Sequence, residues 1–226
     1  MKRLFLTLSV LFLLQFSYAQ KWYSIENNCN ESYSTQLIQS TDESIVVDVS
    51  LNGFFTKEVK TSRAASVVVY NNDMAPLMEI GQPDVPSLSI PIIIDDFSKM
   101  AVRVTKLEYI DYHDVEIAPS RGDFPRSVNP DNVPYQYGEV YEQDAFFPSS
   151  NVKLDSPYII RDFRAQNIIL TPFSYNPITK TLRVYHKMRV EVFNTKGEAV
   201  NVKTRHSNNI VLDTEYKNMY SKEVVA

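Results

Sequence analysis

The chain has 226 residues, of which 44% are hydrophobic and 12% aromatic, and its formal net charge is −4. This length and composition predict one folded domain or at most two small ones, and they exclude an intrinsically disordered chain. The mildly acidic balance argues against nucleic acid or an anionic membrane surface as a partner, and the single cysteine excludes an internal disulfide framework and a Cys-rich zinc site.

Residues 1–19 have the pattern of a secretory signal peptide. A basic start is followed by an apolar run over residues 4–16, and small residues precede a cleavage site between Ala19 and Gln20. The apolar run is too short to be a membrane anchor, since spanning a bilayer takes about 20 residues. We therefore expect export through the inner membrane and no membrane span after the signal is removed. The protein is expected first in the periplasm and then at the cell surface or outside the cell.

Most of the remaining chain has the pattern of β-strands. Weak alternation over residues 44–51 and 101–112, and short β-branched runs at 66–70, 88–94 and 167–170, predict strands. Residues 182–192 alternate cleanly between apolar and polar side chains, which predicts a longer strand with one face toward a core. Turn signals separate these runs, among them Gly81-Gln82-Pro83 and Asn129-Pro130-Asp131. Short strands divided by such turns indicate an antiparallel sandwich or barrel.

Two segments depart from this pattern. Residues 118–148 contain several prolines and little alternation, and a loop of this length is usually either functional or disordered. Near the C-terminus, Tyr216, Met219 and Tyr220 have helical spacing after a candidate N-cap at Asp213 or Thr214. This spacing predicts a short helix within residues 213–226.

The reactive residues form no recognisable catalytic or metal site. Cys29 lies in a polar segment without the basic neighbour that would activate a thiol. The three histidines, His113, His186 and His206, do not have the spacing of metal ligands. We expect His186 to lie on the same strand face as Val184 and Met188, as a core or interface histidine rather than a metal ligand. The inventory predicts that the chain is not an enzyme and uses no metal or cofactor.

The long loop and its flanks resemble the N-terminal propeptide of the gingipain family, Arg- and Lys-specific cysteine peptidases exported by Bacteroidetes. The likeness is strongest over about residues 80–193. It is carried by the runs IAPSRG at 117–122, RSVNPD at 126–131, VPYQYG at 133–138, PYIIRD at 157–162 and PFSYNPITKTLRVY at 172–185. The resemblance implies an all-β fold, an antiparallel β-sandwich, which we expect to be of jelly-roll type.

The resemblance also implies a function and a site. The family's propeptide assists the folding of its peptidase and keeps it latent by placing a basic loop side chain in the S1 pocket. The family's inhibitory arginine corresponds to Arg126, between Pro125 and Ser127, and Arg121 is the rival anchor. Pro125 replaces the small polar residue expected before that arginine, which could change the fit of the loop or slow its cleavage. The residues expected to shape the loop are Asn129, Pro130, Asp131, Pro134 and Tyr135.

The expected organisation is a signal peptide at 1–19, a propeptide-like sandwich at 20–212 with its inhibitory loop at 118–148, and a helix or linker at 213–226. The partner implied is a gingipain-like cysteine peptidase catalytic domain, in cis or in trans. Two alternatives stay open. The chain could be the N-terminal fragment of a full peptidase precursor, or it could be a surface adhesion sandwich with exposed Tyr135, Tyr137 and Tyr141 as its binding platform.

Overall fold

The computed structural model describes residues 20–204 apart from 27–30, 42, 64 and 161–162. The predicted signal peptide, Cys29, His206 and the predicted C-terminal helix lie outside the described residues. No helix within the described part of the chain is both long and apolar enough to cross a membrane.

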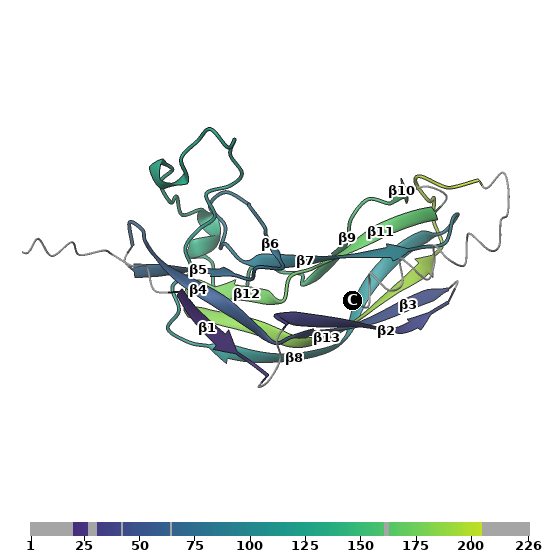
Figure 1. The fold of residues 1–226 in the computed structure, drawn as a ribbon, viewed down its shortest axis with the longest axis horizontal. Coiled ribbons are helices and arrows are strands. Elements are labelled where there is room, and N and C mark those ends of the chain that lie inside the picture. The colour runs from purple at the N-terminus through teal and green to yellow at the C-terminus, as the bar shows by residue number, and fades with distance from the viewer. Residues whose placement is uncertain (1–19, 27–30, 42, 64, 161–162, 205–226) are drawn as a thin grey trace, which may run out of the picture.

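Two five-stranded antiparallel sheets lie face to face as layers (Figure 1). In one sheet, the long strand β13 (Thr181–Thr195) is central and pairs with β8 (Lys99–Tyr112) along one side. Its other side pairs with β12 (Phe173–Asn176) and then with β3 (Ser44–Leu51), which in turn pairs with β2 (Tyr33–Ser40). The second sheet has the order β10 (Tyr158–Ile160), β11 (Phe163–Leu170), β7 (Pro86–Ile93) and β6 (Ala75–Pro76), with β9 (Val152–Leu154) also paired to β11.

A third sheet of three strands lies beside this pair. It has the order β1 (Gln20–Ser24), β4 (Gly53–Lys60) and β5 (Ala65–Tyr70). All strand pairs are antiparallel, so the all-β antiparallel architecture predicted from the sequence is confirmed. The strands predicted at 44–51, 66–70, 88–94, 101–112, 167–170 and 182–192 are all present, with small differences in their ends.

Burying one face of each sheet creates two hydrophobic cores. The first lies between the five-stranded sheets, where alternate residues of β3 and β13, such as Val47 and Val190, meet Ile90 of β7 and Ile168 of β11. The second lies at the other end and is rich in aromatic side chains. It contains Leu51, Phe54, Val69, Val85, Ile117, Tyr141, Phe173, Tyr175, Leu182 and Val184. Because Ile117 directly precedes the long loop and Tyr141 lies in its returning arm, the second core holds both arms of that loop.

β13 departs from the predicted alternation at one point. Its register with β8 shifts between Tyr185 and Lys187, where a β-bulge inserts an extra residue. As a result Tyr185 is buried and His186 is only half-buried. The expected core position for His186 is therefore wrong, and the alternative of an interface position stays a prediction.

Candidate functional site

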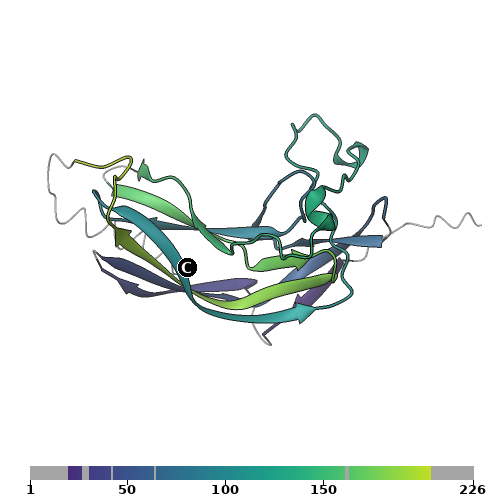
Figure 2. The same cartoon turned by 180° about the vertical axis from the view of Figure 1, so that it is seen from behind.

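The long loop stands out from the body as the teal segment above β5 and β12 (Figure 1), and it is seen from behind in Figure 2. Its outgoing arm is joined to β5 by two backbone bonds. The Val67 amide donates to the Glu116 carbonyl at 2.8 Å, and the Ala118 amide donates to the Val67 carbonyl at 2.8 Å. These bonds form a parallel bridge between Val67 and Ile117, and Ile117 is fully buried.

Above this bridge, both arms of the loop pair with the turn around Gly81. The Ser120 amide donates to the Gln82 carbonyl at 2.7 Å, and the Gly138 amide donates to the Gly81 carbonyl at 2.9 Å. Gly81 has a φ of +78°, and a Cβ there would lie 3.2 Å from the Gly138 nitrogen. A glycine is thus needed at position 81 for both the turn and the close approach. This confirms the turn predicted at Gly81-Gln82-Pro83.

The tip of the loop is a hydrogen-bonded turn with Arg126 and Ser127 at its two central positions. The Val128 amide donates to the Pro125 carbonyl at 2.9 Å, which closes the turn. Both central residues are exposed. Within the described part of the chain, no side chain or backbone group forms a hydrogen bond or ion pair with the Arg126 guanidinium. Pro125 fixes its own φ, which limits the conformations that this turn can adopt.

A second turn follows directly. Asn129 caps the 3-10 helix η1 (Pro130–Asn132), because its side-chain oxygen accepts from the Asp131 amide at 3.0 Å. Proline in the first turn suits this helix, since no donor is lost there. The turn predicted at Asn129-Pro130-Asp131 is confirmed, and it reverses the chain toward the body.

Arg121, on the outgoing arm of the loop, contacts three residues that lie beyond the tip. Its guanidinium donates to the carbonyl of Pro130 and, at 3.4 Å, to that of Val133. The same group lies 4.6 Å from the centre of the Tyr135 ring. Pro134, which lies between Val133 and Tyr135 in the sequence, is exposed. Arg121 and Arg126 therefore differ in kind: Arg121 braces the loop, and Arg126 projects from its tip.

The tyrosines of the returning arm attach it to the body. Tyr141, on the 3-10 helix η2 (Glu139–Glu142), is 3% exposed, and its hydroxyl donates to the Ile117 carbonyl at 3.0 Å. The Tyr137 hydroxyl lies 2.7 Å from the Thr61 hydroxyl and 3.2 Å from that of Ser66. Burial raises the pKa of Tyr141 well above its usual range. An exposed platform of Tyr135, Tyr137 and Tyr141 is thus wrong, because η2 turns Tyr141 into the second core.

Asp84 is a titratable group at the root of the loop. Its backbone amide donates to the Ala118 carbonyl at 3.1 Å. Burial raises the pKa of its carboxyl to about 6, against the opposing effect of the Arg121 guanidinium. Its Oδ1 atom is buried without a hydrogen-bond partner among the described residues. The sequence pattern gave no signal for this group, since its burial depends on the folded loop.

The predicted signal cleavage site is only partly within the structure. Ala19 lies outside the described residues, and Gln20 is the first residue of β1, where it pairs with Lys57 of β4. Among the described residues, no three His, Cys, Asp or Glu side chains are grouped so that they could hold a metal ion.

Comparison with known proteins identifies a family to which this chain is similar. The family model Propeptide_C25 matches residues 26–221. Gingipain R1 of Porphyromonas gingivalis is 34% identical over 188 residues, which is 83% of this chain and 19% of that protein. Gingipain R2 of the same species is 39% identical over 138 residues, which is 61% of this chain and 19% of that protein. The chain thus spans about a fifth of the length of these relatives.

Two solved structures have a similar fold. A chain in the complex of Porphyromonas gingivalis RgpB pro- and mature domains superposes with a TM-score of 0.75 and 31% identity, covering 84% of this chain and 98% of that one. A structure described as giving structural insight into zymogenic latency of gingipain K, from the same species, has a TM-score of 0.65 and 18% identity. That match covers 79% of this chain and 100% of the other, and at this identity it shows the fold alone.

Proposed function

Because the chain belongs to the Propeptide_C25 family, we propose that it is a non-catalytic propeptide that keeps a gingipain-like cysteine endopeptidase latent and assists its folding. The proposed partner is the peptidase's catalytic domain. The solved complex of RgpB pro- and mature domains supports this choice, since this chain is 31% identical to a chain within it. We further propose that the protein is exported and acts outside the inner membrane.

One observation carries the inhibitory mechanism: an exposed arginine without a partner among the described residues stands at the tip of an ordered loop. Arg126 is proposed to enter the S1 pocket of the peptidase. An Arg-selective pocket presents a carboxylate, which a guanidinium can meet with two parallel hydrogen bonds. The Arg126 guanidinium is exposed and has no hydrogen bond or ion pair among the described residues, so docking into a pocket breaks no such contact.

The order of the loop supports the same proposal. A loop that is already folded loses less conformational entropy on binding than a flexible one. Here the backbone pairs at Gly81, the brace from Arg121 and the cap from Asn129 hold the tip before any partner arrives. Arg121 is the weaker candidate for the S1 pocket, because entering it would break contacts that hold the two arms together.

The mechanism is the same whether the propeptide acts in cis, as part of a longer precursor, or in trans. In cis, the linked peptidase domain is present at a high effective concentration, so a modest affinity is enough for latency. In trans, the affinity of the loop and its surroundings must be sufficient by itself. Inhibition in trans is therefore the stricter test.

The test is inhibition of a purified Arg-specific gingipain by the chain from Gln20 onward. We expect the parent chain to inhibit, and Arg126→Ala to raise the inhibition constant by more than about tenfold, as loss of an anchoring residue often does. Arg126→Lys should also weaken inhibition of an Arg-specific enzyme, because lysine lacks the planar fork.

The matched control is Arg103→Ala. Arg103 is an exposed arginine on β8, paired with Glu191 at 2.7 Å and remote in sequence from the loop. It should leave the inhibition constant unchanged. If Arg126→Ala inhibits as well as the parent chain, Arg126 is not the anchor, whatever the effect of the control.

A further inference from the structure

The root of the long loop is a short two-stranded ribbon. Backbone hydrogen bonds between 2.7 and 3.1 Å join residues 81–84 to residues 118–120 of the outgoing arm. Pro83 and Pro119 form an antiparallel bridge at the middle of this ribbon, and the Asp84 amide donates to the outgoing arm at one end. Because the ribbon joins the outgoing arm to the body, a change that weakens it loosens the loop at its base.

Two side-chain oxygens on the ribbon are buried without a donor. The Oδ1 atom of Asp84 and the Oε1 atom of Gln82 have no hydrogen-bond partner among the described residues. The bridge at Pro83 makes the backbone between them extended, so the two side chains lie on the same face of the ribbon. A buried acceptor without a donor costs free energy. A proton on Asp84 reduces this cost, because a neutral carboxyl is a donor as well as an acceptor.

The charged and titratable groups that act on Asp84 come from both arms of the loop. On the outgoing arm, the Arg121 guanidinium favours the ionised carboxylate, but it is held by the carbonyls of Pro130 and Val133. On η2, the Tyr141 hydroxyl interacts with Asp84 and stays neutral, since burial raises its pKa. Burial of Asp84 outweighs the effect of Arg121 and raises the pKa of this carboxyl to about 6.

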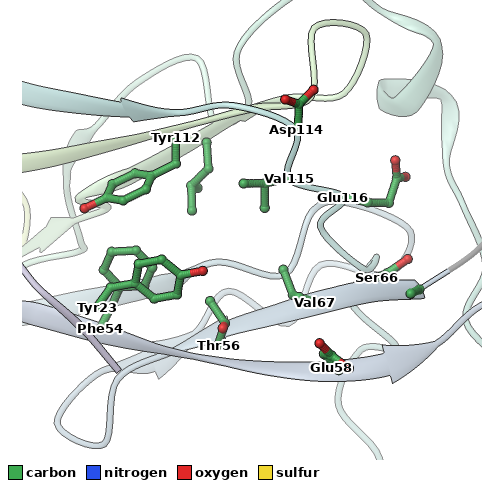
Figure 3. Close-up of a pocket in the computed structure, with 12 residues that line it drawn as sticks. Tyr23, Phe54, Thr56, Glu58, Ser66, Val67, Tyr112, Asp114, Val115 and Glu116 are labelled. Carbon is green, nitrogen blue, oxygen red and sulfur yellow. The ribbon is translucent and has the colours of Figure 1, made fainter. Parts of the chain in front are cut away.

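A second carboxylate, that of Glu116, also acts on the Tyr141 hydroxyl. It lines a separate cavity of about 230 Å³ between the segment 112–116 and the strands β4 and β5 (Figure 3). Its charge is compensated by the Lys180 ammonium, whose Nζ lies 3.2 Å from a carboxylate oxygen. Asp84 differs from it, because Asp84 makes no ion pair within the described part of the chain.

We infer that the root of the loop is a proton-dependent latch, which is closed while Asp84 is protonated and opens more readily once Asp84 is ionised. In the closed ribbon the carboxylate is held away from water without a donor. Parting of residues 81–84 from the outgoing arm admits water to it. Ionisation and opening therefore favour each other.

The consequence for inhibition rests on the proposed function. The Arg121–Gly122 bond follows the arginine that an Arg-specific peptidase selects. Pro119 and Ser120, directly before this bond, belong to the ribbon and cannot enter a peptidase cleft while the root is closed. Cleavage of a transiently opened segment follows the population of its open form. Ionised Asp84 therefore shortens the lifetime of the inhibitory loop, and protonated Asp84 prolongs it.

The first test is hydrogen exchange of the chain from Gln20 onward at pH 4 and pH 8, corrected for the intrinsic effect of pH on exchange. The amides of Gly81 and Ser120 donate across the ribbon and should lose at least about tenfold of their protection between these pH values. A pKa of 3.8 in the open form and about 6 in the closed form allows a change of at most about 60-fold. Val190, in the central strand β13, reports global unfolding and should exchange more slowly at both pH values.

Equal protection of Gly81 and Ser120 at the two pH values overturns the latch. Exchange of these amides as slow as that of Val190 also overturns it, because the root would then open only when the whole fold unfolds. This measurement needs no variant, so it decides the inference even where a substitution prevents folding.

The second test is trypsin digestion at pH 8, with Arg126→Gln in every chain so that the tip is not cut first. Asp84→Asn cannot ionise, so its cleavage after Arg121 should be at least about tenfold slower than that of the parent. Asp114→Asn, which replaces an exposed carboxyl before the outgoing arm, is the matched control and should be cut at the parent's rate. Thermal unfolding establishes that each chain is folded. Equal rates in the parent and Asp84→Asn overturn the latch.

Neither test uses a gingipain, so the latch and the proposed function fail separately. The consequence has its own test with an Arg-specific gingipain at pH 8, in chains that keep Arg126. Inhibition by Asp84→Asn should last longer than inhibition by the parent. Equal durations overturn the role of the latch in inhibition, and a parent that never inhibits overturns the proposed function instead.

Discussion

At the scale of single residues, Asp84 makes the stability of the fold depend on pH. Its pKa is about 6 in the folded chain, against an ordinary value of 3.8. The folded state therefore binds the proton more tightly than the unfolded state, and this group stabilises the fold below about pH 4. That contribution is lost as the pH rises to above 6, and it amounts to at most about 3 kcal/mol. The carboxylates of Asp48, Asp95 and Asp111 act in the opposite direction, because hydrogen bonds lower their pKa values.

Asp84→Asn isolates this effect. We expect the variant to be more stable than the parent at pH 7.5, and its advantage to shrink as the pH is lowered from 6 to 4. The measurement is the free energy of unfolding in urea at each pH. Asp123→Asn, an exposed aspartate of the loop, is the control. A pH-independent difference between Asp84→Asn and the parent would show that the carboxyl is not protonated more readily in the folded chain.

At the scale of elements, the short helix η2 decides whether the returning arm is held to the body. It places Tyr141 in the second core and brings its hydroxyl to the Ile117 carbonyl. We expect Tyr141→Phe to cost about 1 kcal/mol of stability through the lost hydrogen bond. Tyr141→Ala should cost about 3–5 kcal/mol and release the arm, because it also leaves a hole in the core.

Urea unfolding measures the stability of these two variants, and limited trypsin digestion under native conditions measures the release of the loop. Cleavage after Arg126 should be faster in Tyr141→Ala than in Tyr141→Phe. Tyr109→Ala is the control, since Tyr109 is 50% exposed on β8. If cleavage is equally fast in all three, η2 is not what holds the loop.

At the scale of the whole molecule, the two cores share strands and should unfold together. β3 contributes Val49 to the first core and Leu51 to the second, and β13 contributes Met188 and Val184 in the same way. Separating the cores would mean breaking continuous strands. We therefore expect one cooperative transition for the described fold.

The single tryptophan provides the test of this cooperativity. Trp22 lies on β1 in the three-stranded sheet, with its ring 4.6 Å from that of Phe55. Its fluorescence therefore reports on the end of the molecule that contains the second core, whereas far-UV circular dichroism reports on all three sheets. The two urea midpoints should coincide. Midpoints that differ would mean that the three-stranded sheet unfolds as a separate unit.

The sequence predicts these features unequally, for physical reasons. Alternation is local, so residues 182–192 were sufficient to predict most of β13. The bulge at Tyr185 depends on the partner strand β8, and no pattern within β13 indicates it. Likewise, the resemblance pointed to both Arg121 and Arg126. Their difference arises from carbonyls of Pro130 and Val133, which reach Arg121 only after the loop has folded back.

Besides the tyrosines of its returning arm, the loop is joined to the body by main-chain hydrogen bonds at its root, where Ser120 pairs with Gln82 and Gly138 with Gly81. Main-chain hydrogen bonds at the root do not depend on which side chains stand at the tip of the loop. The four residues of the terminal turn, Pro125–Val128, can therefore be exchanged as a cassette while the stem keeps its shape. Under the proposed mechanism, exchanging this turn would retarget the same scaffold to peptidases of different specificity, because the sandwich and the stem of the loop stay unchanged.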